Sequence, residues 1–118
     1  MHGLPPDLDL SGFVGRELFQ FSVGWNEVHF AFDPGYSIQT EASLVLESGG
    51  GAIHTYENAR DAAGRLVDLL GSSVTSISGE TSGTLSLVFS NGWTCRFFED
   101  PQPYESYSVE IESKRTYV

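Results

Sequence analysis

The clearest pattern along this chain is an alternation of apolar and polar residues over residues 83–99. Its first apolar members are Leu85, Leu87 and Phe89. Successive side chains of a strand point to opposite faces, so these three share one face. The dipeptide Asn91-Gly92 follows, and between two alternating runs it is a strong signal for a hairpin with a type I′ turn. The segment therefore predicts a β-hairpin that buries one face.

A weaker copy of this pattern occupies residues 26–41. When the sequence is shifted by about 57 positions without a gap, Phe32 falls on Phe89 and Gly35 falls on Gly92. The two copies share the order Phe-x-x-Gly-aromatic, which predicts a duplicated β unit. Pro34 precedes Gly35 in the first copy, and proline cannot take the positive φ of a type I′ turn. We therefore expect a different turn there, with Gly35 supplying the positive φ.

A different periodicity separates the two copies. Over residues 58–70, apolar residues recur every three or four positions, which predicts one amphipathic helix. The stripe consists of Ala59, Ala62, Ala63, Leu66, Leu69 and Leu70. Asn58 is placed to cap the start of this helix, and Gly71 is placed to end it in a left-handed conformation.

Further alternating runs predict strands over residues 16–23, 42–47, 72–78 and 107–112. The predicted order is ββββ-α-ββββ, an α+β and mostly β fold of two pseudo-repeated antiparallel units with one helix packed on the sheet. We expect a single domain over residues 1–118, with an irregular arm (1–12), a first β unit (15–47), the helix (58–70) and a second β unit (72–113). The expected shared core is Phe30, Phe32, Leu66, Leu70, Leu87, Phe89 and Val109. Trp25, in a turn, is expected to lie over the core as a lid.

Composition and charge narrow the function classes. The chain has 118 residues with 40% hydrophobic content, which is enough for a packed core. Sixteen acidic residues against six basic ones give a net charge of −10. This charge argues against binding to nucleic-acid phosphates or anionic membranes, and it suits a basic protein partner. The N-terminus has no basic region and no long apolar run, so we expect no signal peptide or membrane span and a cytoplasmic location.

The residues that usually carry catalysis or metal binding are scattered. Cys95 lies in a predicted strand between aromatic residues, which favours a buried apolar thiol over a nucleophile. His2, His29 and His54 lack the spacing of a metal site. The glycines at 49–51 are not followed by the Lys-Ser/Thr of a phosphate-binding loop. We therefore expect no catalytic residue, no metal and no cofactor.

The densest polar and aromatic cluster is Tyr104-Glu105-Ser106-Tyr107. Tyrosines provide amphipathic contact area, and a carboxylate can accept a hydrogen bond or bind a cation. The candidate binding residues are Tyr104, Glu105, Tyr107, Arg96, Glu110 and Glu112. Alternatively, Tyr107 packs inward and Glu105 pairs with Arg16 or Arg96. An acidic face is expected from Glu99, Asp100, Glu105, Glu110 and Glu112.

Three short motifs occur in a fixed order. They are Gly15-Arg16-Glu17-Leu18, the Gly83 to Gly92 hairpin ending in Phe89-Ser90-Asn91-Gly92, and Tyr104-Glu105-Ser106-Tyr107. This order resembles a family of small bacterial proteins of unknown function, and it is loosely similar to immunity proteins of toxin systems. The sequence departs from that pattern at Asp33-Pro34-Gly35. The family has no established activity, so the resemblance assigns no role to a residue.

Three kinds of function stay open. The leading one is a protein-binding, immunity-like module whose acidic surface meets a basic protein. The second is a small-molecule binder or enzyme with a cleft near Trp93, Arg96 and Glu105. The third is a homodimer formed through exposed strand edges, with no other ligand.

Overall fold

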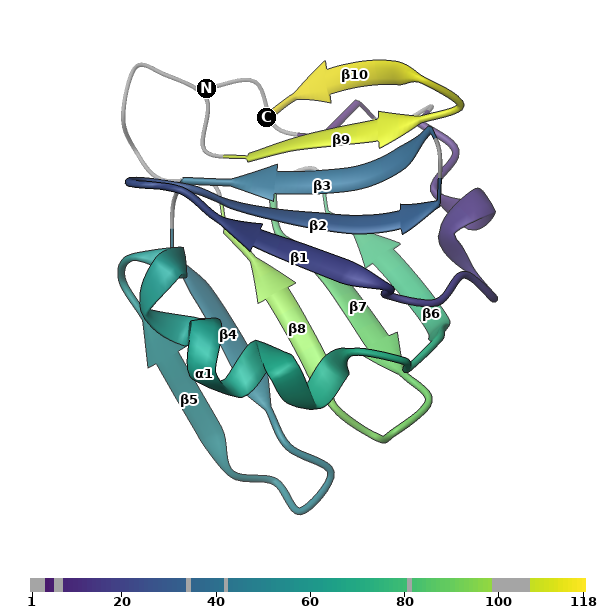
Figure 1. Cartoon of the computed structure of the whole chain (residues 1–118). Helices are drawn as coiled ribbons and strands as arrows, with labels where there is room; N and C mark the ends of the chain where they lie inside the picture. Colours follow the sequence, from purple (N-terminus) through teal and green to yellow (C-terminus); the bar gives the residue numbers. More distant parts are fainter. Residues whose placement is uncertain (1–3, 6–7, 34, 42, 81, 99–106) are drawn as a thin grey trace.

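Ten strands, one short α-helix and three 3₁₀ turns are present in the computed structural model, which describes residues 4–5, 8–33, 35–41, 43–80, 82–98 and 107–118 (Figure 1). The strands are β1 Gln20–Val23, β2 Val28–Asp33, β3 Tyr36–Thr40, β4 Leu44–Glu47, β5 Ile53–Tyr56, β6 Val74–Gly79, β7 Leu85–Phe89, β8 Thr94–Phe97, β9 Tyr107–Ile111 and β10 Lys114–Tyr117. They form two five-stranded sheets, ordered β1-β2-β3-β9-β10 and β5-β4-β8-β7-β6. The predicted α+β, mostly β fold class is confirmed.

Each half of the chain contributes strands to both sheets in the same way. Strands β1, β2 and β3 lie in the first sheet, and the hairpin β4–β5 then crosses to the second. Strands β6, β7 and β8 lie in the second sheet, and the hairpin β9–β10 crosses back. β9 therefore pairs with β3, and β4 pairs with β8. Every sheet is completed by a hairpin from the other half.

The pairing registers of the two central hairpins confirm the predicted duplication. Phe30 lies opposite Ile38 in the β2–β3 hairpin. The residues 57 positions later, Leu87 and Cys95, lie opposite each other in β7–β8. The same shift carries Gly35, with φ of 88°, onto Gly92, with φ of 91°. The two hairpins share their register along the strands and a positive-φ glycine in the turn, but they differ beside the turn, where the register of β2–β3 shifts between Ala31 and Asp33.

The equivalence extends to the segments that precede the two hairpins in the sequence, and these segments contact each other. The amide of Leu18 donates to the carbonyl of Ser72 at 2.9 Å, and the amide of Val74 donates to the carbonyl of Arg16 at 2.9 Å. The two hydrogen bonds are equivalent, because Arg16 and Leu18 correspond to Ser72 and Val74 at a shift of 56 positions. This exchange joins the starts of β1 and β6 side by side.

The helical turns at these starts are also equivalent. The 3₁₀ turn η1, Ser11–Phe13, precedes Gly15, and the 3₁₀ turn η3, Val67–Leu69, precedes Gly71. Gly15 has φ of 89° and Gly71 has φ of 85°. Only glycine takes this conformation without strain. Residues 11–23 are therefore the structural counterparts of residues 67–79.

Two strands were missed by the sequence prediction, so each half has five strands and not four. They are β5 and β10, and they occupy equivalent places as the outermost strands of the two sheets. Neither contains a run of buried residues, because both lie at a sheet edge with much of their surface in water. Without a fully buried face, the apolar alternation that marks a strand is weak.

The predicted helix over residues 58–70 is shorter and less regular than expected. It consists of η2 Ala59–Ala62, α1 Ala63–Leu66 and η3 Val67–Leu69, called here the central helix. Its buried residues, Ala59, Ala62, Leu66 and Leu69, are separated by three, four and three positions. These spacings match the 3₁₀, α and 3₁₀ turns that contain them. Asn58 makes no capping hydrogen bond through its side chain, and Leu70 is extended and 40% exposed.

The Asn91-Gly92 turn is not the expected type I′ turn. Among described residues other than glycine, positive φ occurs at Glu112 and Ser113 alone, so Asn91 lacks the conformation that type I′ requires. The amide of Gly92 donates to Phe89 and the amide of Phe89 donates to Trp93, which closes a three-residue loop with Gly92 in the left-handed region. The Asn91 side chain instead donates to the carbonyl of Asp68 at 3.0 Å and ties this turn to the central helix.

Aromatic side chains fill the space between the sheets. Phe32 and Phe89, the equivalent residues of the two hairpins, stack on each other with ring centroids 6.4 Å apart. Phe30 meets Phe97 edge to face at 5.3 Å, and Phe13 meets Phe32 in the same way at 5.5 Å. The predicted core residues are all buried except Leu70. The duplicated hairpins therefore bury their equivalent faces against each other.

We predict that Phe89→Ala lowers the free energy of unfolding by about 3–5 kcal/mol, because it leaves a cavity beside Phe32 at the centre of the core. Leu70→Ala should cost less than about 1 kcal/mol, because Leu70 lies at the surface with 40% of its area exposed. Urea unfolding followed by tryptophan fluorescence measures both. Equal losses in the two variants would contradict this assignment of the core.

Candidate functional site

The candidate binding residues that the structure describes are divided between the two sheets, with Arg96 in β8 of one sheet and Tyr107, Glu110 and Glu112 in or beside β9 of the other. Tyr104 and Glu105 lie outside the described residues. Tyr107 is buried, and its hydroxyl donates to the carbonyl of Gly83 at 2.5 Å. It thereby fixes the start of β9 to the loop before β7. Tyr107 is a core residue, as the inward-packing alternative anticipated.

Arg96 lies on the outer face of the second sheet. Its guanidinium binds the Glu47 carboxylate of the neighbouring strand at 3.0 Å, and both side chains are about one-third exposed. Trp93 has the same strand phase as the buried Cys95, so it points to the opposite face from Arg96. Trp93 and Arg96 therefore lie on opposite faces of the second sheet, and Glu105, the third member of the expected cleft, lies outside the described residues.

Glu110 lies on the outer face of the other sheet and is already engaged. Its carboxylate accepts a hydrogen bond from Ser37 at 3.0 Å and lies 3.8 Å from the guanidinium of Arg115. Arg115 also donates to Ser108 at 2.6 Å. Glu112 is exposed in the β9–β10 turn, with φ of 51°. Of the expected acidic face, Glu99, Asp100 and Glu105 lie outside the described residues.

Arg16 pairs with a carboxylate close to the first hairpin turn. Its guanidinium binds Asp33 at 2.6 Å and lies 3.7 Å from the ring centroid of Tyr36. The hydrogen bond to Asp33 raises the pKa of Arg16 above its already high ordinary value. Asp33 and Tyr36 flank the turn, so Arg16 holds the segment before β1 against it.

Potential metal ligands are not gathered in the described part of the chain. No cluster of three or more His, Cys, Asp or Glu side chains there could hold a metal ion. Burial raises the pKa of the Cys95 thiol far above its usual range, so this thiol stays protonated. Every buried side-chain polar atom among these residues has a hydrogen-bond partner. No helix among them is long and apolar enough to cross a membrane.

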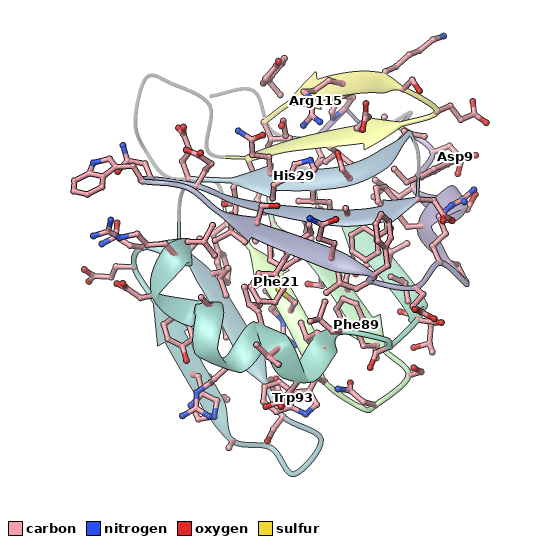
Figure 2. All side chains as sticks on the ribbon, in the orientation of Figure 1. Asp9, Phe21, His29, Phe89, Trp93 and Arg115 are labelled. Carbon is pink, nitrogen blue, oxygen red and sulfur yellow. The ribbon has the colours of Figure 1, made fainter. Side chains whose placement is uncertain are left out.

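Exposed apolar side chains, in contrast, are concentrated along one line of the molecule. The described chain has eight large apolar side chains that are exposed, and five of them lie in or beside β1, on the central helix or directly after it. These five form the β1–helix strip: Phe19, Val23, Trp25, Val67 and Leu70. Phe21, half-buried, lies between β1 and the helix (Figure 2).

Two hydrogen bonds hold the two sides of this strip together. At one end the amide of Gly71 donates to the carbonyl of Leu18 at 2.9 Å. At the other end the guanidinium of Arg60 donates to the carbonyl of Trp25 at 2.8 Å. The central helix therefore runs antiparallel to β1. Phe19 and Val23 belong to the inner face of the first sheet at its edge strand, where the second sheet no longer covers it.

A shallow hollow of about 170 Å³ marks the Trp25 end of the strip, lined by Trp25, Asn26, Asn58 and Arg60. Trp25 is 80% exposed at the tip of the β1–β2 hairpin. The Arg60 guanidinium lies over its ring, 5.1 Å from the centroid, which is a cation–π contact. The lid position expected for Trp25 is wrong: the hairpin tip extends past the sheet, so the indole has no core beneath it.

Sequence reasoning missed this strip because its members belong to different patterns. Phe19 and Val23 alternate like ordinary core residues, and Leu70 follows the apolar stripe of the helix. A signal was nevertheless present in the repeat. Extending the comparison of the two halves to residues 11–23 and 67–79 places Thr75 at the position of Phe19, and Ser11 at that of Val67.

We predict that Tyr107→Phe lowers the free energy of unfolding by about 1 kcal/mol, because it removes the hydrogen bond to Gly83 and leaves that carbonyl without its donor. Chemical unfolding measures the loss. Tyr117→Phe is the matched control, since Tyr117 is exposed in β10, and it should have little effect. A loss of similar size in both variants would show that the buried hydroxyl contributes nothing specific.

We predict that Cys95 does not react with a thiol reagent in the folded protein between pH 7 and pH 9. Its burial excludes the reagent, and its raised pKa keeps the thiol protonated. The same thiol should react fully in denaturant, as followed by mass spectrometry. Fast labelling of the folded protein would show that the second sheet opens around β8.

The comparisons with known proteins show a family without an activity. No curated protein and no solved structure matches the chain. A family model matches residues 10–116, a range that begins just before η1 and ends within β10. This confirms the expected small family of unknown function, and it gives no information on the similarity to immunity proteins of toxin systems. Since the match covers nearly the whole two-sheet fold, the chain belongs to DUF6188, a family of unknown function.

Proposed function

We propose that this protein is a protein-binding module whose partner is a basic protein. The observation that supports this proposal is that most basic side chains have partners within the chain, whereas most described carboxylates do not. Arg16, Arg96 and Arg115 each pair with a carboxylate of the same chain. Arg60 stacks on Trp25. Most of the six basic residues are thus engaged internally.

The acidic residues, by contrast, are left in excess at the surface. Apart from Asp33, Glu47 and Glu110, the described carboxylates form no ion pair with another described residue. A surface with a net charge of −10 attracts a basic protein over long range and repels nucleic acid. Complementary charge speeds association and selects among partners. An immunity-like inhibitor that covers a basic surface of an enzyme is the form of this proposal that fits the resemblance to toxin-immunity proteins.

The test compares two variants with the same change in net charge. One carries Asp61→Asn and Asp68→Asn on the central helix, and the other carries Glu80→Gln and Glu112→Gln at distant turns. Proteins captured from the source cell at low salt are identified, and the affinity of the main one is measured as salt rises. We expect a basic partner whose binding weakens several-fold with salt, because attraction is screened over roughly 8 Å at physiological ionic strength.

The helix variant should weaken binding more than the distant variant, because its charges lie closer to the exposed apolar side chains. A captured partner with net negative charge, or an affinity that salt does not change, would contradict the proposed function. A stable dimer of the protein that captures nothing would favour self-association instead.

A further inference from the structure

We propose that the β1–helix strip is the docking surface for this partner, and that it receives an apolar segment flanked by lysine or arginine side chains. The charge of the partner rests on the proposed function. The position of the docking surface does not depend on the proposed function, because it is argued from the structure of the strip.

The strip has the composition of a contact surface. Protein interfaces are centred on apolar and aromatic side chains, with tryptophan especially frequent among the residues that dominate binding. Trp25 is 80% exposed, Phe19 52% and Val67 54%. Single exposed apolar residues are common, whereas a contiguous set marks an interaction site. Because β1 and the helix are tied together at both ends, these side chains are presented by a connected framework.

The internal repeat shows that the fold does not require these side chains. Residues 11–23 and 67–79 have the same backbone hydrogen bonds, so each residue of one range has a counterpart in the other. Thr75 occupies the place of Phe19, and Ser11 occupies the place of Val67. Polar residues therefore satisfy the same backbone in the other half. The large apolar residues beside β1 need another explanation, and contact with a partner provides one.

Two further pairs of equivalent positions limit which residues of the strip differ between the halves. Gly79 stands where β1 has Val23, and it lies against Leu4 and Leu10 of the N-terminal segment, which cover that end of β6. Val14 stands where the helix has Leu70, and both are exposed. Leu70 therefore does not distinguish the halves. A Cβ at Gly79 would lie 2.7 Å from Leu4, so packing within the chain accounts for the glycine there. The residues that distinguish the halves without such an explanation are Phe19 and Val67.

The charges around the strip favour a basic occupant. The turn and the helix that frame it carry Glu27, Glu57, Asp61 and Asp68, against Arg60 and Arg65. The Trp25 ring takes part in a cation–π contact with Arg60, so the indole is already positioned to bind a guanidinium, and an incoming cation would compete with Arg60 for this ring. An incoming lysine or arginine would find carboxylates and an aromatic ring at the edge of an apolar surface.

The test variant, called here the exchanged variant, replaces two residues of the strip by the residues found at the equivalent positions of the repeat. Phe19→Thr with Val67→Ser gives each position the residue of its counterpart, so the fold should be retained. The control, Ile53→Thr with Tyr117→Thr, removes two equally exposed apolar side chains from other parts of the surface. Urea unfolding establishes that both double variants are folded before binding is measured.

The probe is a displayed library of random linear peptides, selected on the wild-type protein, with the winning peptide synthesised and titrated. We expect enriched peptides that combine apolar residues with lysine or arginine. Their affinity should fall at least about tenfold in the Phe19→Thr/Val67→Ser variant, as for the loss of central contact residues. The control variant should bind like the wild type.

The remaining outcomes separate this inference from the proposed function. Basic, salt-sensitive peptides that bind the exchanged variant as well as the wild type would overturn the strip and leave the basic partner standing. Strip-dependent peptides without positive charge would keep the strip and overturn the basic partner. Failure to enrich any peptide that distinguishes the wild type from the exchanged variant would overturn the strip. A wild-type dimer that the exchange converts to a monomer would put a second copy there and overturn the separate partner.

Discussion

The rest of the structure depends on how the edges of β3 and β8 are paired. Each is the last of three consecutive strands, and each would leave a row of unpaired backbone groups if its half ended there. The hairpin β9–β10 pairs with β3, and the hairpin β4–β5 pairs with β8. Since each edge is completed by the other half, both sheets depend on both halves. The exchange also brings Phe32 and Phe89 together at the centre of the core.

Within this shared backbone, the core and the surface have diverged to different degrees. Glu47 and Glu110 occupy equivalent positions, one in each exchanged hairpin, and both bind arginine. Yet Arg96 comes from β8, whereas Arg115 comes from β10. Exposed ion pairs contribute little to stability, so the arginine can come from either strand without disturbing the fold. A buried aromatic pair has no such freedom, because any change of volume is felt by its neighbours.

The strip beside β1 is the place where the two halves differ in a way the fold does not explain. At Phe19 and Val67 the other half carries threonine and serine. A duplicated structure provides its own reference for such a comparison. Buried positions that both halves keep apolar report on packing, whereas packing does not account for an exposed position that is apolar in one half alone.

The sequence by itself determined the central hairpins, their repetition, the helical segment between them and most of the core. These features depend on contacts close in sequence, where period and turn residues are direct signals. Only the tertiary structure decided the exchange of hairpins, the edge strands β5 and β10, and the exposure of Trp25 and Leu70. Alternation states that Phe19 and Phe21 share a face, but not that the covering sheet ends beside β1. Burial at a sheet edge depends on what lies across from it, and that is set by chain segments far away in the sequence.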